Sequence, residues 1–397
     1  MIDTLLTPAN ILPQDHDRAV LIGRVWTEGL GPTLVRVTAD HVFDISGIAP
    51  TSSALLEMVD PVGTVREFGG PRIGDTASML ANSASTRRDP ATPWFLAPCD
   101  LQAIKAAGVT FVASMLERVI EEQARGDAGR AEAVRKSVVS VIGDNLRSVK
   151  PGSPQAARLR EVLIAQGVWS QYLEVGIGED AEVFTKAQPM SAVGVGSDIG
   201  LHPKSVWNNP EPEIVLAVNS RGQTRGCTLG NDVNLRDFEG RSALLLGKAK
   251  DNNASAAIGP FIRLFDENFS IDDVRSCELA MRVTAGDGGF EMHGASSLAM
   301  ISRDPLDLVN QTMGAPQART HQYPDGFVLY LGTMFAPTQD RHGPGQGFTH
   351  ELGDIVSVTT PLLGTLVNQV THSDKAMPWT YGMSALMRDL ARRGLLA

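Results

Sequence analysis

Apolar and polar residues alternate in two stretches near the N-terminus. These are residues 19–26 (AVLIGRVW) and 32–46 (PTLVRVTADHVFDIS), with glycine and proline close by. A period of two predicts short β-strands with one buried face. The next stretch, residues 51–59 (TSSALLEMV), has the spacing of a short helix with Thr51 or Ser52 as its N-cap. The N-terminal part of the chain is therefore predicted to be β-rich.

The pattern changes twice further along the chain. Residues 66–93 are rich in glycine, proline and small polar residues and are predicted to be a loop, which supports a small β-rich domain over residues 1–95. Helical spacing begins at Gly108, and amphipathic helices are predicted over about 110–165. Short strands and turns then return until a last helix near the C-terminus. We therefore predict an α+β fold with a larger second domain over residues 96–397.

The overall composition limits the class of partner. The chain has 397 residues, 43% of them apolar and 20% charged, which is typical of a globular protein of about two domains. Its formal net charge is −10 without a basic cluster, so neither nucleic acid nor an anionic membrane is expected as a partner. The three cysteines lack metal-site spacing, and the N-terminus lacks the pattern of a secretory signal. A reduced, cytoplasmic setting is therefore expected.

Two glutamates precede an apolar strand in residues 207–218 (WNNPEPEIVLAV). Alternate residues of a strand face the same side, so Glu211 and Glu213 are predicted to converge. Like charges this close repel unless a cation lies between them or one carboxylate is protonated. Pro210 and Pro212 cannot donate ladder hydrogen bonds, which places the pair at the start or the edge of a strand. The alternative is a solvated strand end without function.

A third carboxylate follows in residues 226–250 (GCTLGNDVNLRDFEGRSALLLGKAK), where a strand and a turn precede an apparent helix start at Asp232. Asp232, Arg236 and Glu239 then share one helical face. An N-cap followed by an exposed ion pair is the alternative. Oxygen ligands from two neighbouring elements suit a hard divalent cation, Mg²⁺ before Mn²⁺ or Ca²⁺.

Several motifs now make the sequence recognisable as a whole. They are, in order, EPE, GNDVNLRD, KAKDNNASAAIGPF, YLGTMFAP and GDIVSVTTPLLGTLVNQV. Their order and spacing resemble the fumarylacetoacetate hydrolase superfamily over about residues 181–371, and more loosely from residue 101. Within it the chain is most similar to the long 2-keto-3-deoxy-pentonate (xylonate or arabinonate) dehydratases. The resemblance implies a mixed β-sheet roll or barrel in the second domain, with residues 110–165 forming a helical lid.

The resemblance also implies a metal site and a catalytic lysine. Glu211, Glu213 and Asp232 match the Mg²⁺ ligands of the superfamily, with Mn²⁺ able to substitute. Lys250 matches the catalytic lysine, and Lys248 is the weaker alternative. No cofactor beyond the metal is required.

Further residues are implied around the substrate. Glu117 falls where the superfamily carries a glutamate on a mobile lid helix, and it is predicted to be catalytic. Ser114 stands where hydrolytic members place a histidine, so the pair that activates water in those enzymes is incomplete here. The predicted substrate-binding residues are Ser114, Arg236, Glu239, Gly332 and Thr333.

These residues predict a dehydration. A 2-oxo acid would chelate Mg²⁺, Lys250 would remove a C3 proton, and Glu117 would assist loss of the C4 hydroxyl. A 2-keto-3-deoxy-pentonate would thereby give 2,5-dioxopentanoate (α-ketoglutarate semialdehyde), a step of oxidative pentose catabolism. One alternative is a hydrolase that cleaves a C–C bond of an acylpyruvate or diketo acid, against which Ser114 counts. Another is a metal-binding protein without turnover. The resemblance further implies a homodimer or a dimer of dimers.

Overall fold

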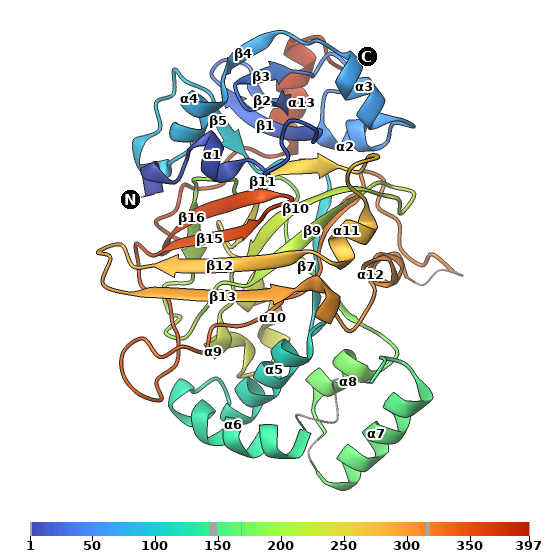
Figure 1. Cartoon of the computed structure of the whole chain (residues 1–397), viewed down its shortest axis with the longest axis vertical. Coiled ribbons are helices and arrows are strands. Elements are labelled where there is room, and N and C mark those ends of the chain that lie inside the picture. The colour runs from blue at the N-terminus through green and yellow to red at the C-terminus, as the bar shows by residue number, and fades with distance from the viewer. Residues whose placement is uncertain (1, 143–148, 168, 315–317, 397) are drawn as a thin grey trace.

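The computed structural model describes residues 2–142, 149–167, 169–314 and 318–396. Along its longest axis the N-terminal strands lie at one end, two β-sheets lie in the middle, and a group of helices lies at the other end (Figure 1). No helix among these residues has both the length and the apolar character needed to span a membrane.

The larger sheet runs through the whole body. Its strand order is β4 (Arg72–Asp75), β3 (His41–Asp44), β2 (Gly31–Val37), β1 (Leu21–Thr27), β11 (Ala256–Leu264), β10 (Thr224–Asp232), β9 (Pro212–Val218), β14 (Phe327–Tyr330), β6 (Ala103–Gly108) and β7 (Glu182–Ala187). A short strand, β5 (Trp94–Leu96), pairs with β1. All pairs are antiparallel except β6 with β14, so the sheet is mixed.

The smaller sheet packs beside the larger one. Its order is β13 (Glu291–Ser297), β12 (Glu278–Thr284), β15 (Ile355–Thr360), β16 (Gly364–His372) and β8 (Asp198–Leu201). Only β16 and β8 pair in parallel. Residues of both sheets, such as Leu229 and Leu366, belong to one hydrophobic core. The predicted mixture of helices with mixed sheets is confirmed, whereas the roll or barrel stays a prediction.

The N-terminal strands continue the larger sheet, because Ile22 of β1 pairs with Ile262 of β11. The predicted short helix is α2 (Ser52–Leu56), and the Thr51 hydroxyl caps it by accepting the N–H of Ala54. Residues 66–93, predicted to be a loop, instead contain β4 and the helix α4 (Thr76–Ala81). That prediction was wrong because β4 is held by its pairing with β3, which local composition cannot reveal.

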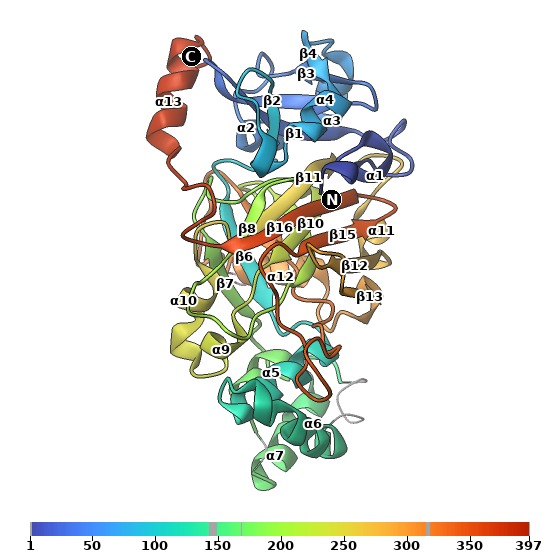
Figure 2. The same ribbon diagram turned by 90° about the vertical axis from the view of Figure 1, so that its left-hand side faces the viewer.

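The C-terminal helix returns to the N-terminal strands. It is α13 (Met383–Arg392), the predicted last helix, and it lies beside β2 (Figure 2). Just beyond it, Arg393 Nη1 donates to the carbonyl of Pro32 over 3.2 Å. The division of the chain at residue 95 stays a prediction.

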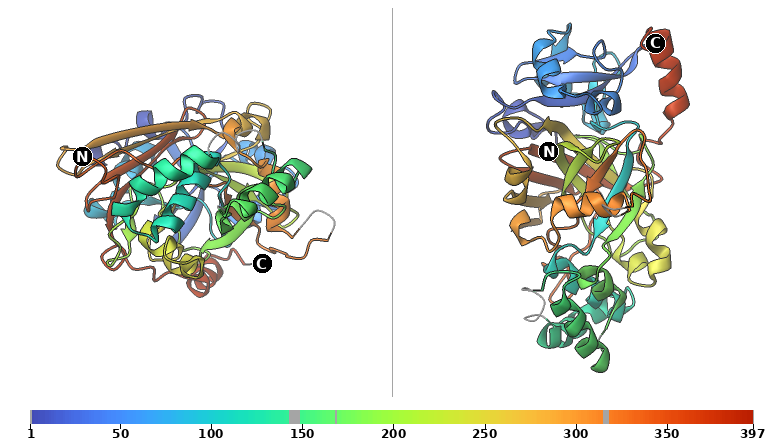
Figure 3. Two further views of the ribbon diagram at one scale, coloured as in Figure 1. Left: turned by 90° about the horizontal axis from the view of Figure 1, so that it is seen from below. Right: turned by 90° about the vertical axis from the view of Figure 1, so that its right-hand side faces the viewer.

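The predicted helical region is confirmed as helix. It comprises α5 (Val112–Ala124), α6 (Ala128–Ile142), α7 (Pro154–Ala165) and α8 (Gln171–Ile177). These four helices, called the helical segment below, have a small apolar core of their own, to which Met115, Leu163 and Leu173 belong. Figure 3 shows them set apart from the sheets. Part of the predicted region, residues 143–148, lies outside the described residues, and its role as a lid stays a prediction.

Short helices complete the structure. They are α1 (Pro8–Ile11), α3 (Pro61–Glu67), α9 (Arg236–Glu239), α10 (Leu246–Lys250), α11 (Ile271–Arg275) and α12 (Pro305–Thr312). Of these, α9 and α10 follow β10 and lie between the sheets and the helical segment (Figure 1).

One of two local predictions near the carboxylates was wrong. The glutamate pair was predicted at the start or the edge of a strand, and it lies at the start: Glu211 directly precedes β9, which lies between β10 and β14 and has every residue buried. Pro212 is tolerated there as its first residue, where a missing N–H costs little. Asp232 is the last residue of β10 and not a helix start; the helix begins four residues later, at Arg236.

Candidate active site

Strand pairing brings three carboxylates together. Glu213 is the second residue of β9 and pairs with Gly230 of β10, so Asp232 at the end of β10 reaches Glu211. The Asp232 N–H donates to the Glu211 carbonyl over 2.9 Å. All three carboxylates are buried, and one oxygen of each lies within 4.8 Å of the others. The structure thus assembles the predicted triad, although the third member arrives on a strand.

The charges of this triad are not evenly compensated. Burial opposes ionisation of Glu211, but Arg118 and Lys250 outweigh it and hold the pKa of Glu211 at about 2. For Glu213, burial and then the charges of Asp232 and Glu211 raise the pKa well above its ordinary value. Glu211 is thus held in its charged form by cations, whereas burial and like charges favour the neutral form of Glu213. A hard divalent cation fits such a set of oxygen ligands, so the triad could hold a metal such as Mg²⁺.

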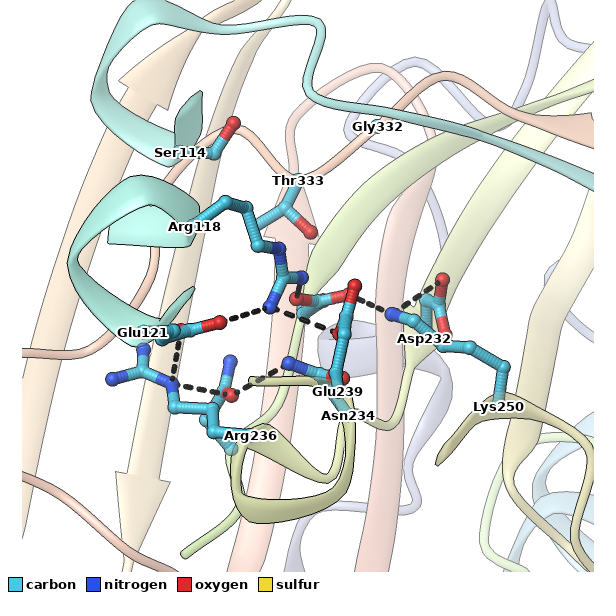
Figure 4. A network of polar contacts seen from close by, with 12 residues as sticks. Ser114, Arg118, Glu121, Asp232, Asn234, Arg236, Glu239, Lys250, Gly332 and Thr333 are labelled. Carbon is cyan, nitrogen blue, oxygen red and sulfur yellow. Dashed lines mark hydrogen bonds and ion pairs between the residues drawn. The ribbon is translucent and has the colours of Figure 1, made fainter. Parts of the chain in front are cut away.

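Of the two candidate lysines, Lys250 contacts the triad. Lys250 Nζ lies 2.6 Å from Glu211 Oε2 and 3.2 Å from Asp232 Oδ2 (Figure 4). Burial acts to lower the pKa of Lys250, but Asp232 and Glu211 raise it further than burial lowers it. Lys248 is exposed, so of the two candidates the structure places Lys250 in the site.

Lys186 was missed by the sequence analysis. It lies on β7, is fully buried, and contacts Asp232 Oδ1 over 2.8 Å and the Lys250 carbonyl over 2.7 Å. Burial lowers its pKa. A lone lysine within the otherwise weakly polar run EVFTKA was the available signal.

The Gly332–Thr333 turn holds one carboxylate of the triad, Glu213. The Gly332 N–H donates to Glu213 Oε2 over 2.7 Å, and the Thr333 hydroxyl donates to Glu213 Oε1 over 3.2 Å. Gly332 has φ +100°, and a Cβ there would lie 1.9 Å from the Thr110 hydroxyl oxygen. Only glycine is accommodated, because both the backbone angle and the space exclude a side chain. The turn predicted to bind substrate thus lies in the site and orients Glu213.

The helical segment contributes one face of α5. Ser114, Arg118 and Glu121 are buried on this face; Arg118 extends toward the triad, and Glu121 lies beside it (Figure 4). The Ser114 hydroxyl lines the site and donates to the Phe111 carbonyl over 2.9 Å. The structure does not bring Glu117 into the site, because its carboxylate pairs with Arg135 over 2.6 Å.

Helix geometry explains this difference. Ser114, Arg118 and Glu121 stand at i, i+4 and i+7, the same spacing as the stripe of Asp232, Arg236 and Glu239 considered above. Ser114 and Glu117 were predicted together as site residues, and Arg118 was not among the predicted residues. The spacing itself was the signal that would have identified Arg118.

Arg236 and Glu239 differ in their access to the site. Arg236 is buried and fully engaged: its Nε lies 2.8 Å from Asn209 Oδ1 and 3.3 Å from Glu121 Oε1, and its Nη2 donates to the Pro337 carbonyl. It does not line the space beside the triad, whereas Glu239 does. Burial raises the pKa of Glu239, and Arg118 Nη1 lies 3.1 Å from its carboxylate.

Glu182 is a titratable residue that the sequence analysis missed. It is the first residue of β7 and pairs with Gly108 of β6. A Cβ at Gly108 would lie 1.9 Å from Glu182 Oε2, so the glycine makes room for this carboxyl group. Burial, and then the charge of Glu239, raise the pKa of Glu182 to about 7. No sequence signal singled it out, because a glutamate at a strand start is usually solvated.

The space enclosed by these groups is small. Glu182, Lys250 and Ser114 line it together with the triad, and its volume is about 10 Å³. That is roughly the volume that one water molecule needs. A carbon substrate would therefore require the lining of this space to rearrange.

Known proteins resemble the chain in sequence and in fold. No family model matches the chain. A probable 2-keto-3-deoxyxylonate dehydratase of Haloferax volcanii is 32% identical over 200 residues, and a 2-dehydro-3-deoxy-D-arabinonate dehydratase of Saccharolobus solfataricus is 30% identical over 194 residues. The alignments cover 50% and 49% of this chain and 63% and 60% of the relatives. The match thus spans less than two thirds of the length of either curated relative.

Solved structures share the fold. A structure of 2-keto-3-deoxy-D-arabinonate dehydratase complexed with magnesium and 2,5-dioxopentanoate superposes with a TM-score of 0.59 at 20% identity, covering 89% of this chain and 99% of that chain. A fumarylacetoacetate hydrolase from Exiguobacterium antarcticum gives a TM-score of 0.52 at 17% identity, covering 89% and 100%.

The motifs, the fold and the curated relatives all point the same way: the chain resembles the fumarylacetoacetate hydrolase superfamily in sequence and in fold. The curated relatives named above are 2-keto-3-deoxy-pentonate dehydratases at about 30% identity over half of the chain. The family resemblance inferred from the sequence motifs is confirmed.

Proposed function

We propose that the protein is a magnesium-dependent dehydratase that converts a 2-keto-3-deoxy-pentonate of the D-xylonate or D-arabinonate type to 2,5-dioxopentanoate and water. One observation carries this proposal: a buried group of three carboxylates in direct contact with the ammonium group of Lys250. The two curated relatives, both named as dehydratases of this substrate class, support it. From the resemblance we also propose a homo-oligomeric, cytoplasmic enzyme of oxidative pentose catabolism.

Each group in the site has a role in this reaction. Magnesium held by the triad would supply Lewis-acid stabilisation of the negative charge that develops on the 2-oxo group. Lys250 would remove a C3 proton, because added positive charge at the triad favours its neutral form. Glu182, which lines the same space, would protonate the departing C4 hydroxide. The C3–H and C4–O bonds break, water leaves, and proton shifts convert the resulting alkene to 2,5-dioxopentanoate.

A C–C bond hydrolase is the competing function. It would need a base to activate water, and no histidine lines the enclosed space among the residues that the structure describes. Ser114 occupies the position where the resemblance implies a histidine in hydrolases. Assays of the purified protein with 2-keto-3-deoxy-pentonates and with acylpyruvates, each with and without Mg²⁺, test the two functions against each other. Turnover of acylpyruvates alone would overturn the proposal.

The acid role of Glu182 predicts a pH dependence. Its pKa of about 7 means that the proton donor is present below this pH and is lost as the pH rises through it. We therefore expect kcat to fall on the alkaline side of about pH 7, or of a somewhat lower value when magnesium is bound. Glu182→Gln cannot donate a proton, so kcat should fall by roughly 10²-fold and lose this alkaline limb.

Glu117→Gln is the matched control for this prediction. It makes the same chemical change on the outer face of α5, where Glu117 pairs with Arg135. We expect a change of less than about threefold in kcat, in line with the modest effect of a partly exposed ion pair. If Glu117→Gln were the inactive variant and Glu182→Gln the active one, the assignment of the acid would be wrong.

A further inference from the structure

Arg118 ties the helical segment to the candidate metal site. It is the middle residue of the buried stripe on α5, and its guanidinium reaches three carboxylates from three different parts of the chain (Figure 4). Nη1 lies 2.8 Å from Glu121 Oε2 and 3.1 Å from Glu239 Oε2, while Nη2 donates to Glu211 Oε1 in a short contact. Only the last of these partners belongs to the triad.

The two ends of the guanidinium are therefore held differently. Glu121 is itself fixed by Arg236, whose Nε lies 3.3 Å from Glu121 Oε1, and Arg236 is anchored in turn by Asn209. Nη1 thus contacts buried carboxylates, one of which, Glu121, is itself held in place by Arg236. Nη2 depends on Glu211 alone, and a cation bound at the triad would compete for that carboxylate. A cation bound at the triad would draw negative charge from Glu211 and weaken its hold on Nη2.

A substrate would need more room beside the triad than the structure offers. The space beside the triad is about 10 Å³, and Arg118 is one of the residues that close it. A five-carbon 2-oxo acid cannot enter unless α5 shifts outward. On its return, the first group of α5 to meet a ligand at the triad would be the Arg118 guanidinium.

We propose that Arg118 determines the preference for an anionic 2-oxo acid: Nη2 exchanges Glu211 for the carboxylate of the substrate, while Nη1 keeps Glu121 and Glu239. A guanidinium suits this exchange because its planar fork binds carboxylates in two directions at once. Closure of the helical segment then depends on the presence of the anion. This inference rests on the proposed function, since it takes the triad as the metal site of an enzyme acting on 2-oxo acids.

Calorimetry separates this role from a structural one. The experiment measures Mg²⁺ binding to the metal-free protein, and then pyruvate binding at saturating Mg²⁺, because pyruvate is a 2-oxo acid without a C4 hydroxyl to lose. In Arg118→Met we expect Mg²⁺ to bind more tightly than in the wild type, since a competing cation beside Glu211 is gone. Pyruvate should bind roughly 10- to 100-fold more weakly, the usual loss of a charge-assisted hydrogen bond. Arg118→Lys, which keeps the charge without the fork, should lie between the two for pyruvate.

The control is Arg135→Met, which removes an arginine of α6 that pairs with Glu117 outside the site. It should leave both affinities unchanged. A purely structural Arg118 would weaken Mg²⁺ and pyruvate together in both Arg118 variants, and unchanged pyruvate affinity would equally overturn the proposal. If the wild type bound Mg²⁺ and pyruvate normally but turned over no 2-keto-3-deoxy-pentonate, the proposed function would fail while the role of Arg118 could still be measured.

Discussion

Lys250→Met is expected to lower kcat by about 10²- to 10⁴-fold, the range that a general base contributes. Methionine keeps a similar length and fills the same buried position, but it can neither accept a proton nor carry charge. The three carboxylates of the triad remain, so Mg²⁺ should still bind. Loss of the lysine should not displace the ligands, because Glu211 keeps Arg118 and Asp232 keeps Lys186 as a charged partner.

Proton exchange measures this step separately from the rest of the reaction. With Mg²⁺ in deuterated water, the wild type should exchange the C3 protons of a bound 2-oxo acid, and Lys250→Met should not. Lys248→Met is the control, because that side chain is exposed two residues away and its loss should be mild. Exchange that persists in Lys250→Met at saturating ligand would show that the lysine only anchors the substrate.

Glu213→Gln and Glu211→Gln are expected to abolish activity in the same way but to affect folding differently. Both remove a metal ligand, so turnover should become undetectable and EDTA should have no further effect. Without metal, however, burial and neighbouring charges already disfavour the charged form of Glu213. Its replacement by the neutral amide should leave the stability of the metal-free protein unchanged or slightly higher.

Glu211 is the opposite case, since its charge is paired with Lys250 and Arg118. Removing one partner of a buried ion pair costs about 3–5 kcal/mol, so Glu211→Gln should lower the melting temperature of the metal-free protein clearly. Thermal unfolding with and without Mg²⁺ measures both effects, because a bound ligand stabilises the folded state in the wild type only. Equal stabilisation by Mg²⁺ in Glu213→Gln would show that the triad is not the metal site.

Local patterns predicted much of the fold. The N-terminal strands, the capped helix after Thr51 and the amphipathic α5 and α13 were predicted correctly, because neighbouring residues largely determine these elements. Strand β4 was missed, and the choice between a strand start and a sheet edge for the two glutamates stayed open, because the position of a strand in a sheet depends on partners far away in sequence. Asp232 was assigned to a helix for the same reason: its strand ends only where the pairing of β10 with β9 and β11 ends.

The residues of the candidate site also divide into those that local motifs reveal and those that depend on distant strand pairing. The triad and Lys250 could be found because their motifs are compact and keep their spacing. Glu182 gave no signal and Lys186 only a weak one, since both lie on β7, a strand that is brought to the site by its pairing with β6. Arg118 was missed because a charged residue on an amphipathic helix is usually exposed, whereas here the helix turns that face toward buried carboxylates.

The measurement that most directly tests the account is the identity of the product. Purified protein with Mg²⁺ and a 2-keto-3-deoxy-pentonate should form 2,5-dioxopentanoate in equal amount to the substrate consumed, as followed by NMR. The reaction should stop on addition of EDTA and resume when excess Mg²⁺ or Mn²⁺ is restored. Unchanged activity in EDTA would contradict the account. Cleavage of acylpyruvates, with no product from a 2-keto-3-deoxy-pentonate, would contradict it equally.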